Sequence, residues 1–182
     1  MTGLVQFITS LVPPIVAQVF GIIGLVIIVL SFQCKQNKYF FILQGTGGFM
    51  FFLNFIFIGA FGGAFFNLAN LIRGLLFSNG KKKVWKLILV EISYTLCFVF
   101  SIVLDHLPWS VFLVALPYTA LIIMSVFMYK GNSKHIRYFQ ITYMSPTWIF
   151  HNIFNFSPGG IICECFNMIS SFIYLLREKK SK

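Results

Sequence analysis

The chain has 182 residues and a formal net charge of +10; 58% of its residues are hydrophobic, 10% are charged, and the mean hydropathy is +0.87. Because a soluble domain carries roughly 25% charged residues to face water, this composition excludes an ordinary soluble fold and predicts an all-α membrane protein in contact with the lipid bilayer. In such a protein, membrane topology explains the excess of Lys and Arg more economically than nucleic-acid binding does, so no nucleic-acid partner is expected.

Seven apolar stretches are each long enough to cross a membrane as a helix, which takes about 20 residues for roughly 30 Å of hydrocarbon. They span residues 14–34, 39–58, 62–79, 84–104, 108–128, 136–154 and 160–177. The first stretch lacks the basic start and the small-residue cleavage site of a signal peptide, so it is interpreted as a membrane helix. Residues 1–12 are expected to form a short external segment.

The basic residues lie in or directly beside every second connection between these stretches. They lie after the first, third and fifth stretches and at the C-terminus, at Lys35, Lys38, Lys81, Lys82, Lys83, Lys86, Lys130, Lys134, Arg137, Arg177, Lys179, Lys180 and Lys182. The connections in between, around Gly59-Ala60, Asp105-His106 and Asn155-Phe156, contain no Lys or Arg. Under the positive-inside rule, this alternation predicts a multi-pass protein with its N-terminus outside and its C-terminus in the cytoplasm.

The two halves of the chain form an internal repeat when the sequence is shifted by 97 residues. Without a gap, this offset aligns Val29 with Val126, Ile56-Phe57 with Ile153-Phe154, Gly62-Gly63 with Gly159-Gly160, Asn70 with Asn167, Ile72 with Ile169, and Lys82-Lys83 with Lys179-Lys180. Stretches one to three thereby overlay stretches five to seven, turn on turn. Such repeats are common in membrane carriers.

The fourth stretch has no counterpart and is expected to be a linker. Three crossings end on the opposite side of the membrane, so one extra crossing is needed to give both copies the same orientation. The predicted fold is therefore seven transmembrane helices in a 3+1+3 parallel-repeat arrangement. Residues 1–83 would form the first triple-helix bundle, residues 84–107 the linker helix, and residues 108–182 the second bundle with a basic cytoplasmic tail.

The sequence also resembles a known family. The stretch Leu30-Ser31-Phe32-Gln33-Cys34-Lys35, followed by Gly59-Ala60 and Asn67-Leu68-Ala69-Asn70-Leu71-Ile72-Arg73, resembles the YgjV-type bacterial inner-membrane proteins. The 3+1+3 plan resembles the wider SWEET, PQ-loop and PnuC-like (MtN3-like) transporter superfamily. In SWEET-like carriers an asparagine from the third helix of each repeat faces the central substrate cavity, and the resemblance gives that role to Asn70 and Asn167. The chain departs from that superfamily in lacking a clear Pro-Gln motif.

Four polar residues in the third and seventh stretches are candidates for binding a solute, because polar groups inside a membrane are costly unless they are partnered. Asn70 and Asn167 lie near mid-depth, and one turn outward lie Asn67 and its counterpart Glu164. The two central amides either converge on a polar solute, which is favoured, or hydrogen-bond between helices as packing contacts. Glu164 either carries a proton coupled to transport or lines a water-filled outer vestibule.

Arg73 and Glu91 lie at similar depths in neighbouring stretches. Because an unpaired buried charge is expensive, a structural ion pair between them is preferred over a substrate-binding role for Arg73.

Helix-weakening residues interrupt the second and sixth stretches at corresponding places, and a further proline lies in the fifth stretch, where the matching position of the first stretch is Phe20. Gly47 and Gly48 lie in the second stretch, and Pro117 and Pro146 lie in the second half. These residues are candidate hinges for alternating access, and the glycines are equally compatible with close helix packing.

Neither a metal site nor an enzyme is predicted. The four cysteines, Cys34, Cys97, Cys163 and Cys165, show no metal-binding spacing. There is no nucleotide-binding or hydrolase motif, and no cofactor is expected.

The leading hypothesis is a carrier in the bacterial inner membrane that binds a neutral polar solute, such as a sugar or a nucleoside-like vitamin, between the two bundles. The alternative is a non-transporting partner or regulator that retains the carrier fold. The oligomeric state, including a homo-oligomer, is left open.

Overall fold

The described part of the chain is helical. In the computed structural model it comprises residues 14–31, 37–78, 80, 83–104 and 108–180. Its elements are α2 (Pro14–Ser31), α3 (Asn37–Phe57), α4 (Phe61–Phe77), α5 (Val84–Leu104), α6 (Pro108–Lys130), α7 (Ser133–Phe139), the π-helical turn η1 (Gln140–Met144), α8 (Ser145–Phe154) and α9 (Pro158–Lys180). Because α7, η1 and α8 are continuous and form one helix, which we call the composite helix, these elements make seven helical segments. The predicted external segment 1–12 and the turn at residues 33–35 lie outside the described residues.

Each predicted membrane stretch corresponds to one of these segments. Four of them are long and apolar enough to cross a membrane: Lys38–Phe57, Val84–Leu104, Val111–Lys130 and Pro158–Lys179. The apolar helices Ile15–Ser31 and Phe61–Phe77 are somewhat shorter, and the sixth segment is divided by its π-helical turn. The expectation of an all-helical membrane protein is confirmed at this level.

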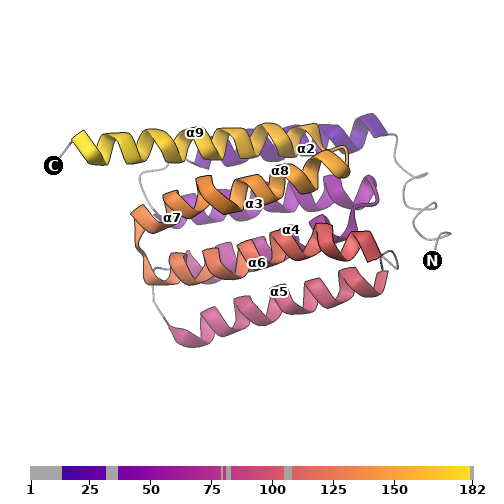
Figure 1. The fold of residues 1–182 in the computed structure, drawn as a ribbon, viewed down its shortest axis with the longest axis horizontal. Coiled ribbons are helices and arrows are strands. Elements are labelled where there is room, and N and C mark those ends of the chain that lie inside the picture. Colours follow the sequence, from indigo (N-terminus) through magenta and orange to yellow (C-terminus); the bar gives the residue numbers. More distant parts are fainter. Residues whose placement is uncertain (1–13, 32–36, 79, 81–82, 105–107, 181–182) are drawn as a thin grey trace.

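The helices form a closed ring in chain order. Each segment packs against the next along the chain, and α9 packs back against α2. An additional contact joins α4 to α6 across the ring. All segments run nearly along the long axis of the molecule, as Figure 1 shows.

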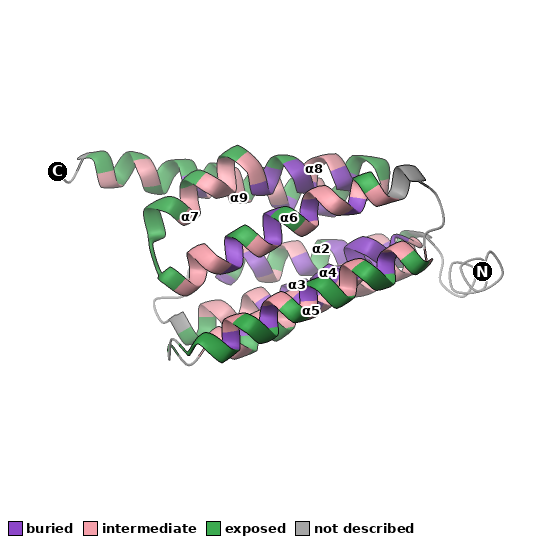
Figure 2. Cartoon of the chain, turned by 60° about the horizontal axis from the view of Figure 1, so that its bottom comes forward, coloured by how far each residue is buried: buried purple, intermediate pink, exposed green. Residues whose placement is uncertain are grey.

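The outer surface of the ring is apolar. Large hydrophobic side chains such as Ile88, Phe100 and Phe172 are more than half exposed, and Figure 2 shows exposed residues along both α5 and α9. A water-soluble protein rarely exposes so extensive an apolar surface, whereas lipid accommodates it without penalty.

The ring has two chemically different ends. At one end lie the start of α5, the α6–α7 connection and the C-terminal part of α9, with Lys83, Lys130, Lys134 and Arg177 (Figure 1). We call this the basic end. The connections 58–60 and 155–157 lie at the other end, which we call the opposite end, and contain no Lys or Arg.

The glycines predicted as hinges lie at helix crossings. α3 is unbroken through Gly47 and Gly48. A Cβ atom on Gly47 would lie 2.5 Å from the side chain of Ile28 on α2, and one on Gly48 would lie 3.3 Å from the backbone of Asn67 on α4. This is the close packing that the alternative interpretation of these glycines expects; their role as hinges stays a prediction.

The interruption of the sixth segment takes the form of the turn η1. The backbone N–H of Ser145 donates to the carbonyl of Gln140, five residues earlier, and Pro146 follows immediately. Such turns occur mostly as single insertions in α-helices, often at functional sites. The other candidate hinge, Pro117, is fully buried within the continuous helix α6.

Candidate functional site

A cavity of about 540 Å³ lies inside the ring of helices. Its volume falls within the usual range for small-molecule sites. Toward the basic end its lining includes the exposed residues Gly80, Lys83 and Ser133, so the cavity opens there. Toward the opposite end the last lining residues are Asn152 and Gly160, both buried.

The structure brings together most of the predicted site residues. Asn67, Asn70, Arg73, Glu164 and Asn167 all line this cavity. They come from α4 and α9, which lie in different halves of the chain. The assignment of a bound solute to them stays a prediction, but the shared cavity that it requires is present.

Asn70 is held by a neighbouring helix. The hydroxyl of Tyr94 on α5 donates to its Oδ1 at 2.6 Å. The amide of Asn67, by contrast, donates to the carbonyl of Gly63 in its own helix at 2.8 Å. Tyr94 thus fixes the orientation of the Asn70 side chain and leaves its amide nitrogen as the donor available to a ligand.

Glu164 belongs to a polar cluster that joins α9 to the π-helical turn. Ser145 Oγ donates to Glu164 Oε2 at 2.7 Å, and Gln140 Nε2 donates to Ser145 Oγ at 2.8 Å. Gln140 Nε2 also lies 3.4 Å from the same carboxylate oxygen. The turn η1 therefore places two donors against this carboxyl group, and proton coupling through Glu164 stays a prediction.

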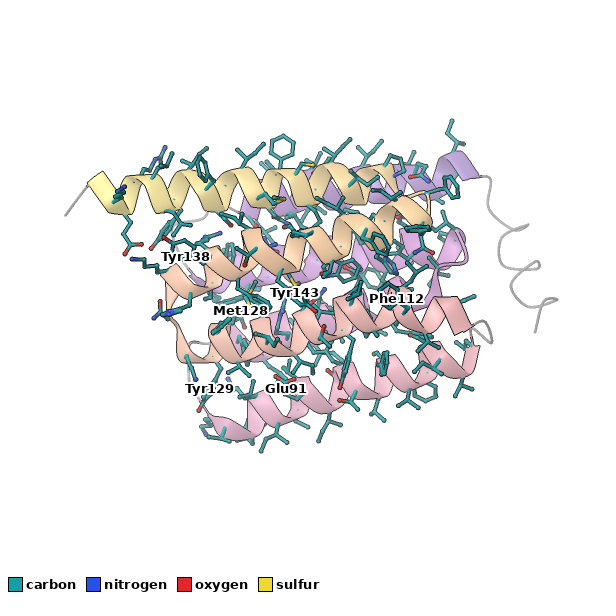
Figure 3. The ribbon with its side chains drawn as sticks, in the orientation of Figure 1. Glu91, Phe112, Met128, Tyr129, Tyr138 and Tyr143 are labelled. Atoms are coloured by element: carbon teal, nitrogen blue, oxygen red, sulfur yellow. The ribbon has the colours of Figure 1, made fainter. Side chains whose placement is uncertain are left out.

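The predicted pair of Arg73 and Glu91 is not joined by a hydrogen bond in this conformation. Both carboxylate oxygens of Glu91, and Nη1 of Arg73, are buried and make no hydrogen bond to any described residue. The guanidinium carbon of Arg73 lies 5.9 Å from the ring centre of Tyr94, close enough for a cation–π interaction. Figure 3 shows Glu91 between α5 and α6, and it does not line the cavity. The ion pair stays a prediction.

The rest of the cavity wall divides into an aromatic and a basic part. Phe51, Phe55 and Trp148 line the deep part near the opposite end. Lys83, Lys86 and Arg137 line the part near the basic end. Lys86 is only 4% exposed, and its Nζ donates to the carbonyl of Leu76 in the last turn of α4 at 2.7 Å.

Hydrogen bonds between the two halves of the chain close the opposite end. The fully buried Asn54 donates to the carbonyl of Ala17 at 2.7 Å and accepts from Ser157 Oγ at 2.9 Å. Nearby, Gln18 Nε2 donates to the carbonyl of Phe156 at 3.2 Å. We call this set of contacts, together with the glycine contacts described next, the seal.

Glycines allow the backbones to approach closely in the seal. A Cβ atom on Gly159 would lie 3.0 Å from the backbone of Gly21 on α2. A Cβ atom on Gly62 would lie 2.5 Å from the side chain of Val114 on α6. In both places the third helix of one half crosses the first helix of the other half.

Sequence reasoning missed several residues of the site and the seal. Ser145 and Gln140 were not recognised as partners of Glu164, nor Asn54 and Ser157 as partners of each other. Asn54 and Ser157 are 103 residues apart, and no sequence pattern pairs them. The buried position of Asn54 in an apolar helix was the available signal that it needed a partner.

Among the described residues, no three His, Cys, Asp or Glu side chains gather into a group that could hold a metal ion.

A model of a protein family described as "Imp-YgjV: Bacterial inner membrane protein" matches residues 15–182 of the chain. No curated protein and no solved structure matches it.

Proposed function

Because the chain belongs to the Imp-YgjV family of bacterial inner membrane proteins, we propose that it is a carrier that moves a small polar solute across that membrane by alternating access. The observation that carries the proposal is a polar cavity in the middle of the ring that is open at the basic end and closed at the opposite end. Water and polar side chains are costly inside a bilayer, so such a cavity is a functional feature by default.

The cavity lining repeats at the offset of 97 residues found in the sequence. Both members of six aligned pairs line it: Phe40 with Arg137, Phe51 with Trp148, Phe55 with Asn152, Asn67 with Glu164, Asn70 with Asn167, and Gly74 with Ser171. Lining residues related in this way support a 3+1+3 parallel repeat in which residues 1–83 and 108–182 form the two bundles and residues 84–107 the linker. Binding at the interface of two repeats is the arrangement common to many carriers.

The positive-inside rule places the basic end in the cytoplasm. The N-terminus is then outside, the C-terminus is inside, and the cavity of this conformation faces the cytoplasm. The seal is the barrier toward the outside. Transport requires a second conformation in which the seal opens and the basic end closes.

Accessibility of a single cysteine tests the proposal. Cys34, Cys97, Cys163 and Cys165 would be replaced by Ser and the cavity residue changed by Asn167→Cys. A membrane-impermeant thiol reagent would be applied to spheroplasts and, separately, to inverted vesicles. A carrier gives labelling from both faces, faster from the cytoplasmic face. The matched control keeps only Cys165, an exposed residue on the same helix that does not line the cavity, and should resist labelling from either face.

Two outcomes contradict the proposal in different ways. If Asn167→Cys reacts with the reagent from neither face, the cavity is not open to water. If it reacts only from the cytoplasmic face, the seal does not open, and a non-transporting partner or regulator with a carrier fold becomes the better explanation.

A further inference from the structure

We propose that the cavity selects an organic anion, with Arg73 as the residue that binds its carboxylate or phosphate group. This inference rests on the proposed function and replaces the neutral solute expected from the sequence with a charged one.

The charge of the cavity wall favours an anion. Among the described residues, four cationic side chains line the cavity, Arg73, Lys83, Lys86 and Arg137, against the single carboxylate of Glu164. Low-dielectric walls of one predominant sign focus the field inside a cleft and raise the local concentration of the opposite ion. A cation entering from the basic end would have to pass three of these positive charges first.

Arg73 differs from the two lysines in its depth. Lys83, Lys86 and Arg137 lie near the basic end, where the positive-inside rule alone accounts for them. Arg137 lies four residues inside α7, where it packs over the Tyr174 ring of α9. Arg73 lies four residues, or about 6 Å along the helix axis, inside the end of α4, whereas Lys86 lies two residues inside the start of α5 and Lys83 lies outside it. Topology does not require a charge at that depth, and an arginine there is expensive unless its charge is matched.

The hydrogen-bonding capacity of Arg73 is not filled within the described part of the protein. Its Nη1 is buried and has no hydrogen-bond partner among the described residues, and the centre of the Tyr94 ring lies 5.9 Å from the guanidinium carbon. A planar guanidinium matches the two oxygens of a carboxylate or phosphate in a bidentate pair. An anionic group in the cavity would supply the missing acceptor.

Glu91 is the competing partner for Arg73. Arg73 is near enough to Glu91 for a Coulomb interaction, but neither oxygen of Glu91 accepts a hydrogen bond from it. Glu91 therefore lies outside the cavity and leaves the hydrogen-bonding capacity of Arg73 Nη1 unfilled, while Arg73 remains part of the lining.

The remaining lining fits the body of such a solute. Asn67, Asn70 and Asn167 offer amide groups at the levels between Arg73 and the deep end, and Trp148 offers an apolar aromatic surface beyond them. The carboxylate of Glu164 already accepts a hydrogen bond from Ser145 Oγ. The expected solute is thus an acid or phosphate ester whose remaining part carries hydrogen-bonding groups.

The test compares an anionic and a cationic reagent at one cavity position. The Met128→Cys variant, with the four native cysteines replaced by Ser, carries its thiol on α6 facing the composite helix (Figure 3), and Met128 lines the cavity. Inverted vesicles would be treated with the methanethiosulfonates MTSES, which is anionic, and MTSET, which is cationic. Each rate would be divided by the rate with free 2-mercaptoethanol.

The expected result is a normalised preference of about tenfold or more for the anionic reagent. Adding Arg73→Gln should reduce this preference at least threefold, whereas Arg73→Lys should retain most of it and Glu91→Gln should not reduce it. Glucose 6-phosphate should slow the labelling more than glucose does at the same ionic strength, and Arg73→Gln should abolish that difference.

Equal rates, or faster labelling by the cationic reagent, would overturn the anion proposal and leave the carrier proposal standing. Stronger protection by glucose than by glucose 6-phosphate would overturn it as well. If neither sugar protects, the ratio of the normalised MTSES and MTSET labelling rates decides whether the anion proposal stands. Labelling by neither reagent from either face would instead contradict the open cavity on which the proposed function itself depends.

Discussion

Asn54 connects three segments at the seal through one side chain. It joins α2, by donating to Ala17, to the turn between α8 and α9, by accepting from Ser157. Asn54 is fully buried, and Ser157 has no exposed surface. Because water cannot replace these bonds inside the seal, the loss of the amide leaves buried polar atoms without partners.

Asn54→Ala is therefore expected to lower the free energy of unfolding by roughly 1–2 kcal/mol, toward the upper end of hydrogen-bond contributions measured in membrane proteins. Thermal unfolding of the purified protein in detergent would measure the change. Asn155→Ala is the matched control at the same end, since that side chain donates only to the carbonyl of His151 one turn earlier. An equal loss in both variants would show that the link between segments contributes nothing beyond a local bond.

At the scale of elements, the crossing of α2 and α9 controls how tightly the seal closes. The backbones meet at Gly21 and Gly159 without any side chain between them, so an added methyl group cannot be relieved by rotating a side chain. It must separate the two helices, and the sealed conformation loses stability relative to an open one.

Gly159→Ala should consequently raise the rate at which Asn167→Cys is labelled from the outside, by about threefold or more. Gly45→Ala provides the control, because a Cβ atom there would meet Leu71 on α4 within the same half of the chain. An unchanged rate of outside labelling in Gly159→Ala would mean that this crossing does not limit opening.

The π-helical turn of the composite helix also determines how polar side chains are placed. Its π-helical turn ends at Met144, two residues before Pro146, and contains Gln140 of the Gln140–Ser145–Glu164 cluster. The extra residue of the turn rotates the two donors relative to the rest of the helix, so that both face α9. A regular α-helix over the same residues would separate Gln140 and Ser145 around the helix axis.

At the scale of the whole molecule, the orientation in the membrane follows from the separation of charges between the two ends. A reporter fused after Lys182 should lie in the cytoplasm. Green fluorescent protein in that position is expected to fluoresce, and alkaline phosphatase is expected to be inactive, because its disulfides form only in an oxidising compartment. Active phosphatase would reverse the orientation and place the cavity opening outside.

The class of the protein and most of its helices follow from the amino-acid sequence alone. Few charges, long apolar stretches and alternating basic connections specify a helical membrane protein, since lipid demands apolar side chains and internally satisfied backbones. The predicted stretches 84–104 and 136–154 correspond to α5 and to most of the composite helix. Asn70, Asn167 and Glu164 were identified because polar residues stand out against an apolar background.

Which of these residues meet, and which end of the cavity is closed, depends on how the helices pack. The partners of Asn54, Glu164 and Arg73 depend on how distant helices are rotated against one another, and no local pattern encodes that rotation. Lipid-facing and cavity-facing surfaces both contain Phe and Ile side chains, so hydrophobic periodicity distinguishes them poorly in a membrane. The seal exists because glycines 97 residues apart in the sequence let two helix crossings close at the same end of the ring.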